Sequence, residues 1–339
     1  MPPNLIESAA RRLSAIPRTR LIALPTPLDR AERLGRQLQL DLWFKRDDLM
    51  GLGFGGNKLR KLEFILADAA ANGVDTLLTT GGAQSNHARL TAATAARLGL
   101  SCELFLKGEP TDARPGNLLL DALFGATIRF CGMIDYREID ARMAERVAEL
   151  ARSGRKAAAI PLGGATGTGA LGYVVAFREL LDQMAVLRDD QKVTVVLAGG
   201  TGSTAAGLIL GASLWAPETS FLVVSASWKI ETLTAEIRRC AAESAELLGV
   251  SAPSLDCVVI ADSYVGPGYA TPSEEGVAAI RTTARTEGIV LDSTYTGKAM
   301  SGLIAMVEAR TIEPDGPVVF LHTGGTPEIF IRDAATLRL

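Results

Sequence analysis

One lysine of this chain follows two glycines at what the pattern predicts to be the start of a helix. The segment reads Gly55-Gly56-Asn57-Lys58, and apolar residues recur after it at helical spacing as far as Gly73. Because the N-terminus of a helix disfavours positive charge, we expect the pKa of Lys58 to fall. A neutral lysine can attack a carbonyl group and form a Schiff base. The alternative is an exposed lysine, since Arg60 and Lys61 show that basic residues are common here.

A glycine-rich loop, Gly199 to Thr204, lies between a predicted strand and a predicted helix. Its glycines can let backbone N–H groups point into one concavity, and the helix N-terminus adds partial positive charge. Hydroxyl groups of Thr201, Ser203 and Thr204 can donate further hydrogen bonds, so with Gly202 they could bind a phosphate dianion. No Gly-Lys-Ser/Thr follows, which excludes a Walker A loop. The alternative is an ordinary tight turn between strand and helix.

Ser85, Asn86 and His87 begin a second predicted helix, which Gly99 closes. Free N–H groups at its start could bind a substrate carboxylate, or Ser85 could simply cap the helix.

Two of the five tyrosines, Tyr269 and Tyr295, lie in glycine-containing turns. Their position suggests roles in a site, although buried tyrosines also commonly satisfy one hydrogen bond and do nothing more.

Two further motifs receive structural interpretations. Gly167 to Gly172 match G-x-G-x-x-G and open a helix, but Gly163 to Thr166 separate them from the preceding strand. A dinucleotide fingerprint follows its strand directly, so we expect a flexible loop beside the site and not an NAD site. The segment Lys45-Arg46-Asp47-Asp48 is interpreted as a salt-bridged strand end.

The elements that must position these residues alternate strand and helix. Short apolar runs predict strands at Val74–Thr80, Cys102–Leu106, Ala157–Leu162, Val193–Ala198, Phe221–Ser225, Val258–Ala261 and Val318–Leu321. This alternation is typical of mostly parallel sheets that are covered on both faces. Ligands bind outside the carboxyl ends of such strands, where the glycine-rich turns and both histidines lie.

Composition excludes several classes of protein. The chain has 339 residues with a net charge of −3, so nothing favours a nucleic acid or a membrane surface as partner. No apolar run approaches the ~18 residues of a membrane span, and no signal peptide is evident, so we expect a cytoplasmic protein. Four scattered cysteines and two histidines make a disulfide framework, a metal site or a Ser-His-Asp hydrolase improbable.

Taken together, the motifs resemble one family, the D-cysteine desulfhydrase / 1-aminocyclopropane-1-carboxylate (ACC) deaminase group of pyridoxal-phosphate (PLP) enzymes. The resemblance runs from about Leu24 to Phe330. Its motifs are Phe44-Lys45-Arg46-Asp47-Asp48, Gly55-Gly56-Asn57-Lys58, Gln84-Ser85-Asn86-His87, Gly266-Pro267-Gly268-Tyr269, Tyr295-Thr296-Gly297-Lys298-Ala299-Met300 and His322-Thr323-Gly324-Gly325.

The resemblance implies a role for each site residue. Lys58 would be the Schiff-base lysine, and Thr201, Gly202, Ser203 and Thr204 would bind the phosphate of PLP. Asn86 would contact the ring hydroxyl, while Thr323 is the candidate for the pyridine nitrogen. Ser85 matches the catalytic serine, and with Asn86 and His87 it would bind the substrate carboxylate. Tyr269 and Tyr295 match the two active-site tyrosines.

One departure bears on the substrate. Bacterial ACC deaminases carry glutamate directly after the second tyrosine, where this chain has Thr296. A glutamate near the pyridine ring strengthens the electron sink, which opening a cyclopropane requires more than expelling a thiol does. Thr296 therefore favours β-elimination from D-cysteine to pyruvate, hydrogen sulfide and ammonia. Ser293-Thr294 and the Thr201–Thr204 loop differ from the desulfhydrase pattern, so L-cysteate sulfo-lyase and ACC deaminase remain alternatives, and a non-catalytic PLP-binding protein is a remote one.

The resemblance also implies an architecture. We expect a two-domain α/β protein with mostly parallel sheets, like the tryptophan synthase β-subunit (PLP fold type II). The smaller domain, residues 54–160, would carry Lys58, and the larger would combine residues 1–53 and 161–339. PLP would lie between them, and the family suggests a homodimer.

Overall fold

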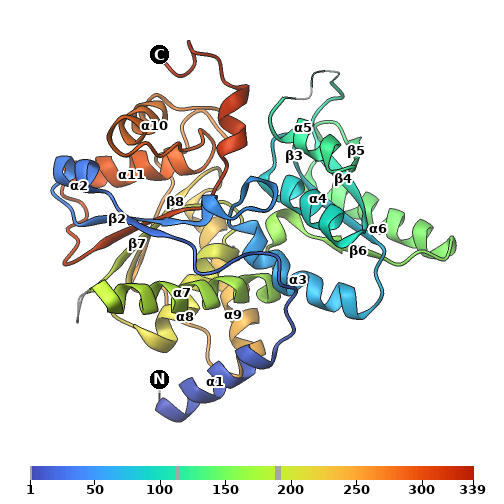
Figure 1. Ribbon diagram of the computed structural model, residues 1–339, viewed down its shortest axis with the longest axis horizontal. Helices are drawn as coiled ribbons and strands as arrows, with labels where there is room; N and C mark the ends of the chain where they lie inside the picture. The colour runs from blue at the N-terminus through green and yellow to red at the C-terminus, as the bar shows by residue number, and fades with distance from the viewer. Residues whose placement is uncertain (1, 112, 114, 188–191) are drawn as a thin grey trace.

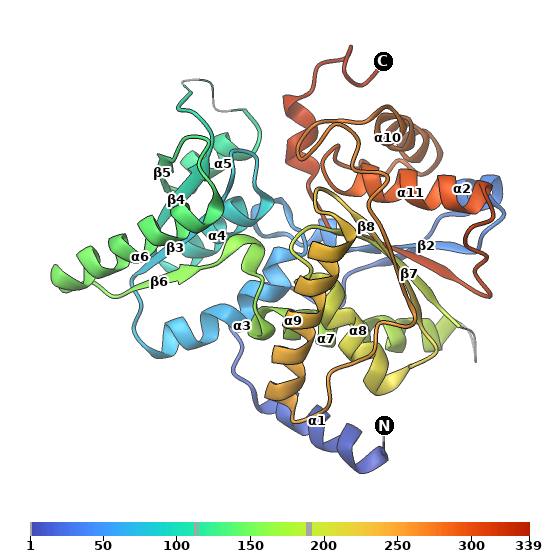
Figure 2. The ribbon, with the colours of Figure 1, turned by 180° about the vertical axis from the view of Figure 1, so that it is seen from behind.

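The strands of this computed structural model form two separate sheets, shown from opposite sides in Figures 1 and 2. The structure describes residues 2–111, 113, 115–187 and 192–339. The α/β class with two mostly parallel sheets is confirmed.

The larger sheet has six strands in the order β1-β2-β10-β7-β8-β9. They span Leu28–Arg30 (β1), Leu42–Arg46 (β2), Thr194–Gly199 (β7), Ser220–Ser225 (β8), Val258–Ala261 (β9) and Val318–His322 (β10). All pairs are parallel except β1 with β2. Helices cover both faces, as the apolar runs predict. One face carries α7 (Gly167–Leu187), α8 (Ser203–Trp215) and α9 (Ile230–Leu248), and the other carries α2 (Glu32–Leu38), α10 (Glu274–Glu287) and α11 (Thr296–Glu308).

The smaller sheet has four parallel strands in the order β5-β4-β3-β6. They span Thr76–Gly82 (β3), Ser101–Lys107 (β4), Thr127–Phe130 (β5) and Ala157–Ile160 (β6). The helices around it are α3 (Lys58–Ala71), α4 (Asn86–Leu98), α5 (Asn117–Leu123) and α6 (Tyr136–Arg152), and α1 (Pro3–Ala15) packs on α9. Four short 3₁₀ turns, Asp47–Leu49, Leu52–Phe54, Leu162–Gly164 and Thr326–Ile331, complete the described elements.

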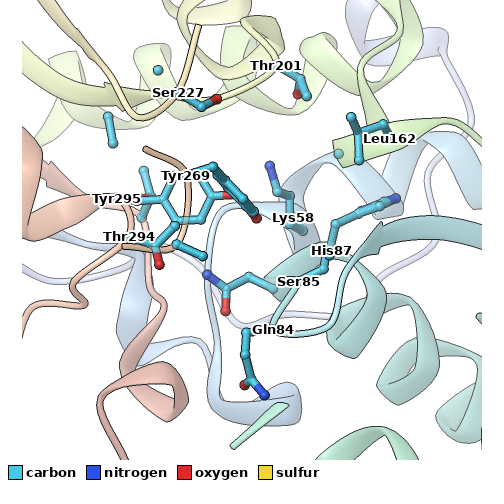
Figure 3. Close-up of a pocket in the computed structure, with 18 of the residues that line it drawn as sticks. Lys58, Gln84, Ser85, His87, Leu162, Thr201, Ser227, Tyr269, Thr294 and Tyr295 are labelled. Carbon is cyan, nitrogen blue, oxygen red and sulfur yellow. The ribbon is translucent and has the colours of Figure 1, made fainter. Parts of the chain in front are cut away.

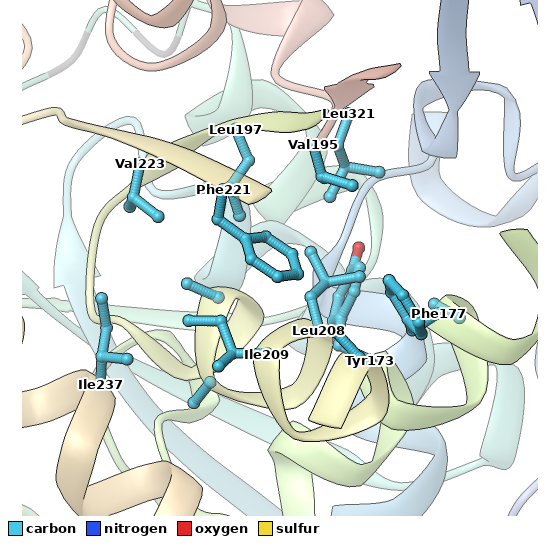
Figure 4. Packing of buried hydrophobic residues seen from close by; sticks show 14 of the residues in the cluster. Tyr173, Phe177, Val195, Leu197, Leu208, Ile209, Phe221, Val223, Ile237 and Leu321 are labelled. Atoms are coloured by element: carbon cyan, nitrogen blue, oxygen red, sulfur yellow. The ribbon is translucent and has the colours of Figure 1, made fainter. Parts of the chain in front are cut away.

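The largest part of the core lies between the six-stranded sheet and helices α7, α8 and α9 (Figure 4). Val195, Leu197 and Val223 of the sheet face Leu208 and Ile209 of α8 there. Burial of such side chains contributes about 1.5–3 kcal/mol each. This packing fixes α8, and with it the loop that precedes the helix.

A buried charge network fixes α3 between the two sheets. The Arg60 guanidinium of α3 donates to Asp47 after β2 (2.9 Å) and to Glu179 of α7 (2.9 Å), and Glu179 also accepts from Lys45 (2.5 Å). Arg60 and Asp47 are fully buried. Breaking such a pair on one side leaves a buried charge uncompensated, which costs about 3–5 kcal/mol. The predicted salt-bridged strand end at Lys45–Asp48 is therefore confirmed.

The glycine motif at the start of α7 is not the flexible loop we expected. Gly167, Gly169 and Gly172 lie in the first turns of α7 and are buried. A Cβ atom on Gly172 would lie 2.2 Å from the carbonyl oxygen of Arg60. The motif therefore serves close packing of α7 against α3, a packing that the local sequence pattern does not reveal.

Each predicted strand is present, with bounds that differ by up to two residues. The strand predicted to reach Leu162 ends at Ile160, because a 3₁₀ turn begins at Leu162. All four strands of the smaller sheet fall between residues 54 and 160, and the division of the chain at these positions stays a prediction. None of the described helices is both long and apolar enough to cross a bilayer.

Candidate active site

One cavity of about 520 Å³ brings the predicted site residues together (Figure 3). The residues of the predicted set that line it are Lys58, Ser85, Asn86, His87, Thr201, Gly202, Thr204, Tyr269, Tyr295 and Thr323. Most of them come from the carboxyl ends of strands in both sheets and from the helix starts that follow, whereas Tyr269 lies in the loop between β9 and α10 and Tyr295 directly precedes α11. Ser203 is fully buried beside the cavity and is not part of its lining.

Lys58 is the first residue of α3. Gly55 before it has φ +66°, and a Cβ there would lie 2.3 Å from the Asp48 carbonyl oxygen, so the turn requires glycine. Burial lowers the pKa of Lys58 to about 8. The expected direction is confirmed, although burial and not the helix terminus is the leading cause. In Figure 3, Lys58 lies between the two tyrosines on one side and His87 on the other.

The loop after β7 has the form that an anion site needs. The strand ends at Gly199, and α8 begins at Ser203 after Gly202, which has φ +79° and provides no side-chain cap. The Thr201 hydroxyl is buried and has no hydrogen-bond partner among the described residues. Uncapped N–H groups, a helix N-terminus and a free hydroxyl together suit a phosphate group.

Lys61, one turn after Lys58 on α3, is a site residue that the sequence interpretation missed. It was taken as a sign of exposed basic residues, but it lines the cavity and is only 1% exposed. Its Nζ donates to the Oγ of Ser203 (2.7 Å), which belongs to the glycine-rich segment 199–204, called the anion loop below. Burial and the neighbouring Lys58 hold the pKa of Lys61 well below its usual value. The available signal was the three-residue spacing, which puts both lysines on one face of a helix.

Asn57, which directly precedes α3, forms hydrogen bonds to two other parts of the cavity wall. Its side-chain amide donates to Thr204 Oγ1 (3.0 Å), and its backbone N–H donates to the carbonyl oxygen of Thr323 (3.0 Å). The start of α3 is thus tied both to the anion loop and to the turn after β10.

Ser85 caps α4 and also lines the cavity, while its contact with a substrate carboxylate stays a prediction. Its Oγ accepts from the Ala88 N–H (3.2 Å). The neighbouring Asn86 is oriented by Asn117 of α5, whose amide donates to Asn86 Oδ1 (3.0 Å).

Burial and the nearby Lys58 hold the pKa of His87 well below its usual value, so a neutral imidazole faces the cavity.

Tyr269 and Tyr295 form a pair on the opposite wall. Their hydroxyl oxygens lie 2.8 Å apart, and their rings meet edge to face with centroids 5.9 Å apart. Burial raises the pKa of Tyr269 to about 12 and that of Tyr295 well above its usual value. Both phenols are therefore protonated at neutral pH and can donate hydrogen bonds or protons.

The described residues that line the cavity include no aspartate or glutamate. Thr296, the residue that bears on the substrate, is fully buried outside this lining, and its hydroxyl is bonded to Asp292. Lys107 adds a further amine, whose Nζ lies 5.4 Å from the centre of the Tyr136 ring. The described lining thus holds three lysines and no carboxylate, which suits anionic ligands.

The family to which this chain belongs is the pyridoxal-phosphate dependent enzymes, whose model matches residues 19–324. Its cofactor fits the cavity: the uncapped start of α8 and the free Thr201 hydroxyl suit the phosphate, and Lys58, with its lowered pKa, suits covalent attachment.

More particular likenesses are to D-cysteine desulfhydrases. The protein of that name from Yersinia enterocolitica is 40% identical over 94% of this chain and 97% of its own length. The one from Serratia proteamaculans is 38% identical over the same shares. A crystal structure titled as an ACC deaminase homologue superimposes over 100% of this chain and 99% of its own, with a TM-score of 0.89 and 35% identity. The resemblance stated from the motifs is confirmed.

Proposed function

We propose that this chain catalyses β-elimination from D-cysteine, in which D-cysteine and water give pyruvate, hydrogen sulfide and ammonia. The observation that carries the proposal is the meeting of Lys58, Ser85 and the two protonated tyrosines in one cavity with the anion loop. A protein that merely stored PLP would need only the lysine and the loop. The desulfhydrases that match along 94% of the chain support the same substrate.

PLP, when bound, supplies an electron sink for charge that develops at the substrate Cα. The chain supplies position and protons. The start of α4 would bind the substrate carboxylate through Ser85 and the amides beside it. Lys58, Ser85 or a tyrosine would take the Cα proton. Tyr269 or Tyr295 would orient the departing sulfur or give it a proton.

The absence of a carboxylate from the described lining supports thiol elimination over ACC deamination. Thr296 gives the cavity no acidic group, because its side chain is a neutral hydroxyl that lies outside the lining and is bonded to Asp292. A neutral hydroxyl such as that of Thr323 would then face the pyridine nitrogen. A pyridine ring whose nitrogen faces a neutral hydroxyl withdraws electrons less strongly than one whose nitrogen is kept protonated by a carboxylate. The weaker electron sink suffices to expel a good leaving group such as a thiol, whereas opening a cyclopropane requires the stronger one.

A second candidate, elimination of sulfite from L-cysteate, is favoured by Lys107. This lysine lines the cavity beside Tyr136 and has no carboxylate within ion-pair distance among the described residues. An ammonium in that place would attract a sulfonate more strongly than a thiol.

The test is to load the purified protein with PLP and to supply D-cysteine, L-cysteate and ACC in turn. Pyruvate with hydrogen sulfide from D-cysteine, and none from the Lys58→Ala variant, is the expected result. Preferred release of sulfite from L-cysteate would select the second candidate, and turnover of ACC would contradict the argument from Thr296. Bound PLP with no product from any of the three would leave a non-catalytic PLP-binding protein.

A further inference from the structure

The loop that carries Tyr269 has little structure of its own. It connects β9, which ends at Ala261, with α10, which begins at Glu274. Tyr269 lies near its middle and is 39% exposed, yet the hydroxyl must stay 2.8 Å from that of Tyr295. Because no strand or helix fixes the loop, contacts from elsewhere have to hold it.

Two cations from other elements contact the backbone on either side of Tyr269. Lys298, in the first turn of α11, donates to the carbonyl oxygens of Gly268 and Val265, both at 2.7 Å. Arg332 donates to the carbonyl oxygen of Ala270 at 2.8 Å. The residues immediately before and after the tyrosine are thus each held by a charged donor, and such bonds are about twice as strong as neutral ones.

The backbone at this point is strained, which shows that outside contacts determine it. Ala270 has φ +58°, a conformation that costs about 1–3 kcal/mol for a residue with a side chain and persists only where its surroundings impose it. Gly266 and Gly268 also have positive φ, at +65° and +148°. The hydrogen bonds from Lys298 and Arg332 are contacts from outside the loop that help to impose this shape.

The two cations differ in how their charges are paired. Lys298 is fully buried, and among the described residues it has no carboxylate within ion-pair distance. Arg332 pairs with Glu328 and also donates to Ser293 Oγ (3.1 Å), two residues before Tyr295. Lys298 itself lies three residues after Tyr295. Residues 293–298 therefore carry Tyr295 and also contact, directly through Lys298 and indirectly through Arg332, the loop that carries Tyr269.

We propose that Lys298 and Arg332 are positioning residues for Tyr269, which hold its loop so that its hydroxyl meets that of Tyr295 in the cavity. The inference rests on the proposed function for its kinetic consequence, while the hold on the loop stands on the geometry alone. Neither cation lines the cavity, so both act through the tyrosine.

The experiment compares PLP-loaded wild type with Lys298→Met, which keeps the buried stem and removes the donor. Because small displacements of a reacting group cost up to ~100-fold in rate, we expect kcat for D-cysteine to fall about 10- to 100-fold with KM nearly unchanged. With 3-chloro-D-alanine the loss should be smaller, since chloride leaves without a proton. Lys298→Arg, which keeps charge and donors, should recover part of the loss.

Two comparisons separate positioning from a general loss of structure. If Lys298 acts through Tyr269, the double variant Lys298→Met/Tyr269→Phe is no slower than Tyr269→Phe alone. Multiplied losses in the double variant would overturn the inference. The matched control is Lys156→Met, because Lys156 also donates to a loop carbonyl, that of Asn72 (3.1 Å), but lies outside the cavity lining. It should keep the kcat of wild type.

Amide hydrogen exchange supplies a readout that does not require turnover. Exchange in residues 262–273 should accelerate in Lys298→Met and in Arg332→Met, while the loop after β7 stays as protected as in wild type. Unchanged exchange in residues 262–273 would overturn the inference whatever the kinetics. A wild type that releases no product from any substrate, but whose variants show the faster exchange, would contradict the proposed function alone.

Discussion

At the scale of single residues, burial decides the chemistry of this cavity. Lys58 and Lys61 lie on one face of α3 with their amines close together, and Lys61 contacts Ser203 instead of a carboxylate. Water cannot stabilise two adjacent ammonium ions there, so the pKa values of both fall. The same burial raises the pKa of the two tyrosines. Amines that lose protons easily and phenols that keep them are thus placed side by side.

The lowered pKa of Lys58 predicts how the apoenzyme takes up its cofactor. Only the neutral amine attacks the aldehyde of PLP, and the pKa lies at about 8 rather than at the ordinary 10.5. The rate of covalent loading, followed by absorbance after rapid mixing, should therefore rise with pH up to about 8 and then level off. A rate that keeps rising beyond pH 9.5 would contradict this pKa. Lys58→Ala should show no such phase at any pH.

Much of the site could be predicted because strand ends in parallel sheets converge. Ser85 after β3, the Gly199–Thr204 loop after β7 and Thr323 after β10 each follow a recognisable apolar run, and all meet in one cavity except Ser203. Asn57, Lys61 and Asn117 could not be found in this way. Their partners Thr204, Ser203 and Asn86 are distant in sequence, and such contacts appear only in the folded chain.

At the scale of elements, the sequence did not reveal the edge strands β1 and β5 or the close packing of helices. Most of the runs that were identified lie inside a sheet, where burial on both faces makes them continuously apolar. The edge strands β6 and β9 were also found, because they are apolar runs although they are only partly buried. By contrast β5, Thr127–Phe130, is an edge strand that alternates exposed and half-buried residues, and β1 has only three residues. Neither forms a continuous apolar run. The role of Gly172 was hidden too, because the residue that demands a glycine there belongs to another helix.

Replacement of Gly172 tests that packing. A Cβ atom would lie 2.2 Å from a backbone oxygen of α3, which cannot move aside without carrying Lys58 with it. We expect Gly172→Ala to lower the free energy of unfolding by about 1–3 kcal/mol, the usual cost of overpacking, as measured by urea denaturation. Gly51→Ala is the matched control, since nothing lies within 4 Å of a Cβ there and its φ is −67°. Equal stability of the two variants would refute the packing role.

At the scale of the whole molecule, the cavity joins the two sheets. The tyrosines and the anion loop belong to elements around the larger sheet, and Ser85, Asn86 and Lys107 belong to the smaller one. Helix α3 contacts both, through the hydrophobic core under β3 and through the buried network of Arg60. A ligand in the cavity would therefore stabilise the arrangement of the two halves as well as each half. The homodimer stays a prediction, for which light scattering is the direct measurement.

This arrangement predicts that much of the stabilisation of the folded chain by PLP comes from the contacts of its phosphate group. A ligand present at 100 times its Kd adds about 2.7 kcal/mol to the free energy of unfolding. Pyridoxal, which has the aldehyde but not the phosphate, can attach to Lys58 yet cannot use the start of α8, so at equal concentration its effect on Tm should be much smaller. Thr201→Val should reduce the PLP effect and leave the pyridoxal effect unchanged, because the free hydroxyl of Thr201 belongs to the anion loop and pyridoxal has no phosphate for it to bind. Equal stabilisation of wild type by the two aldehydes, measured by calorimetry, would mean that the loop after β7 does not bind the phosphate.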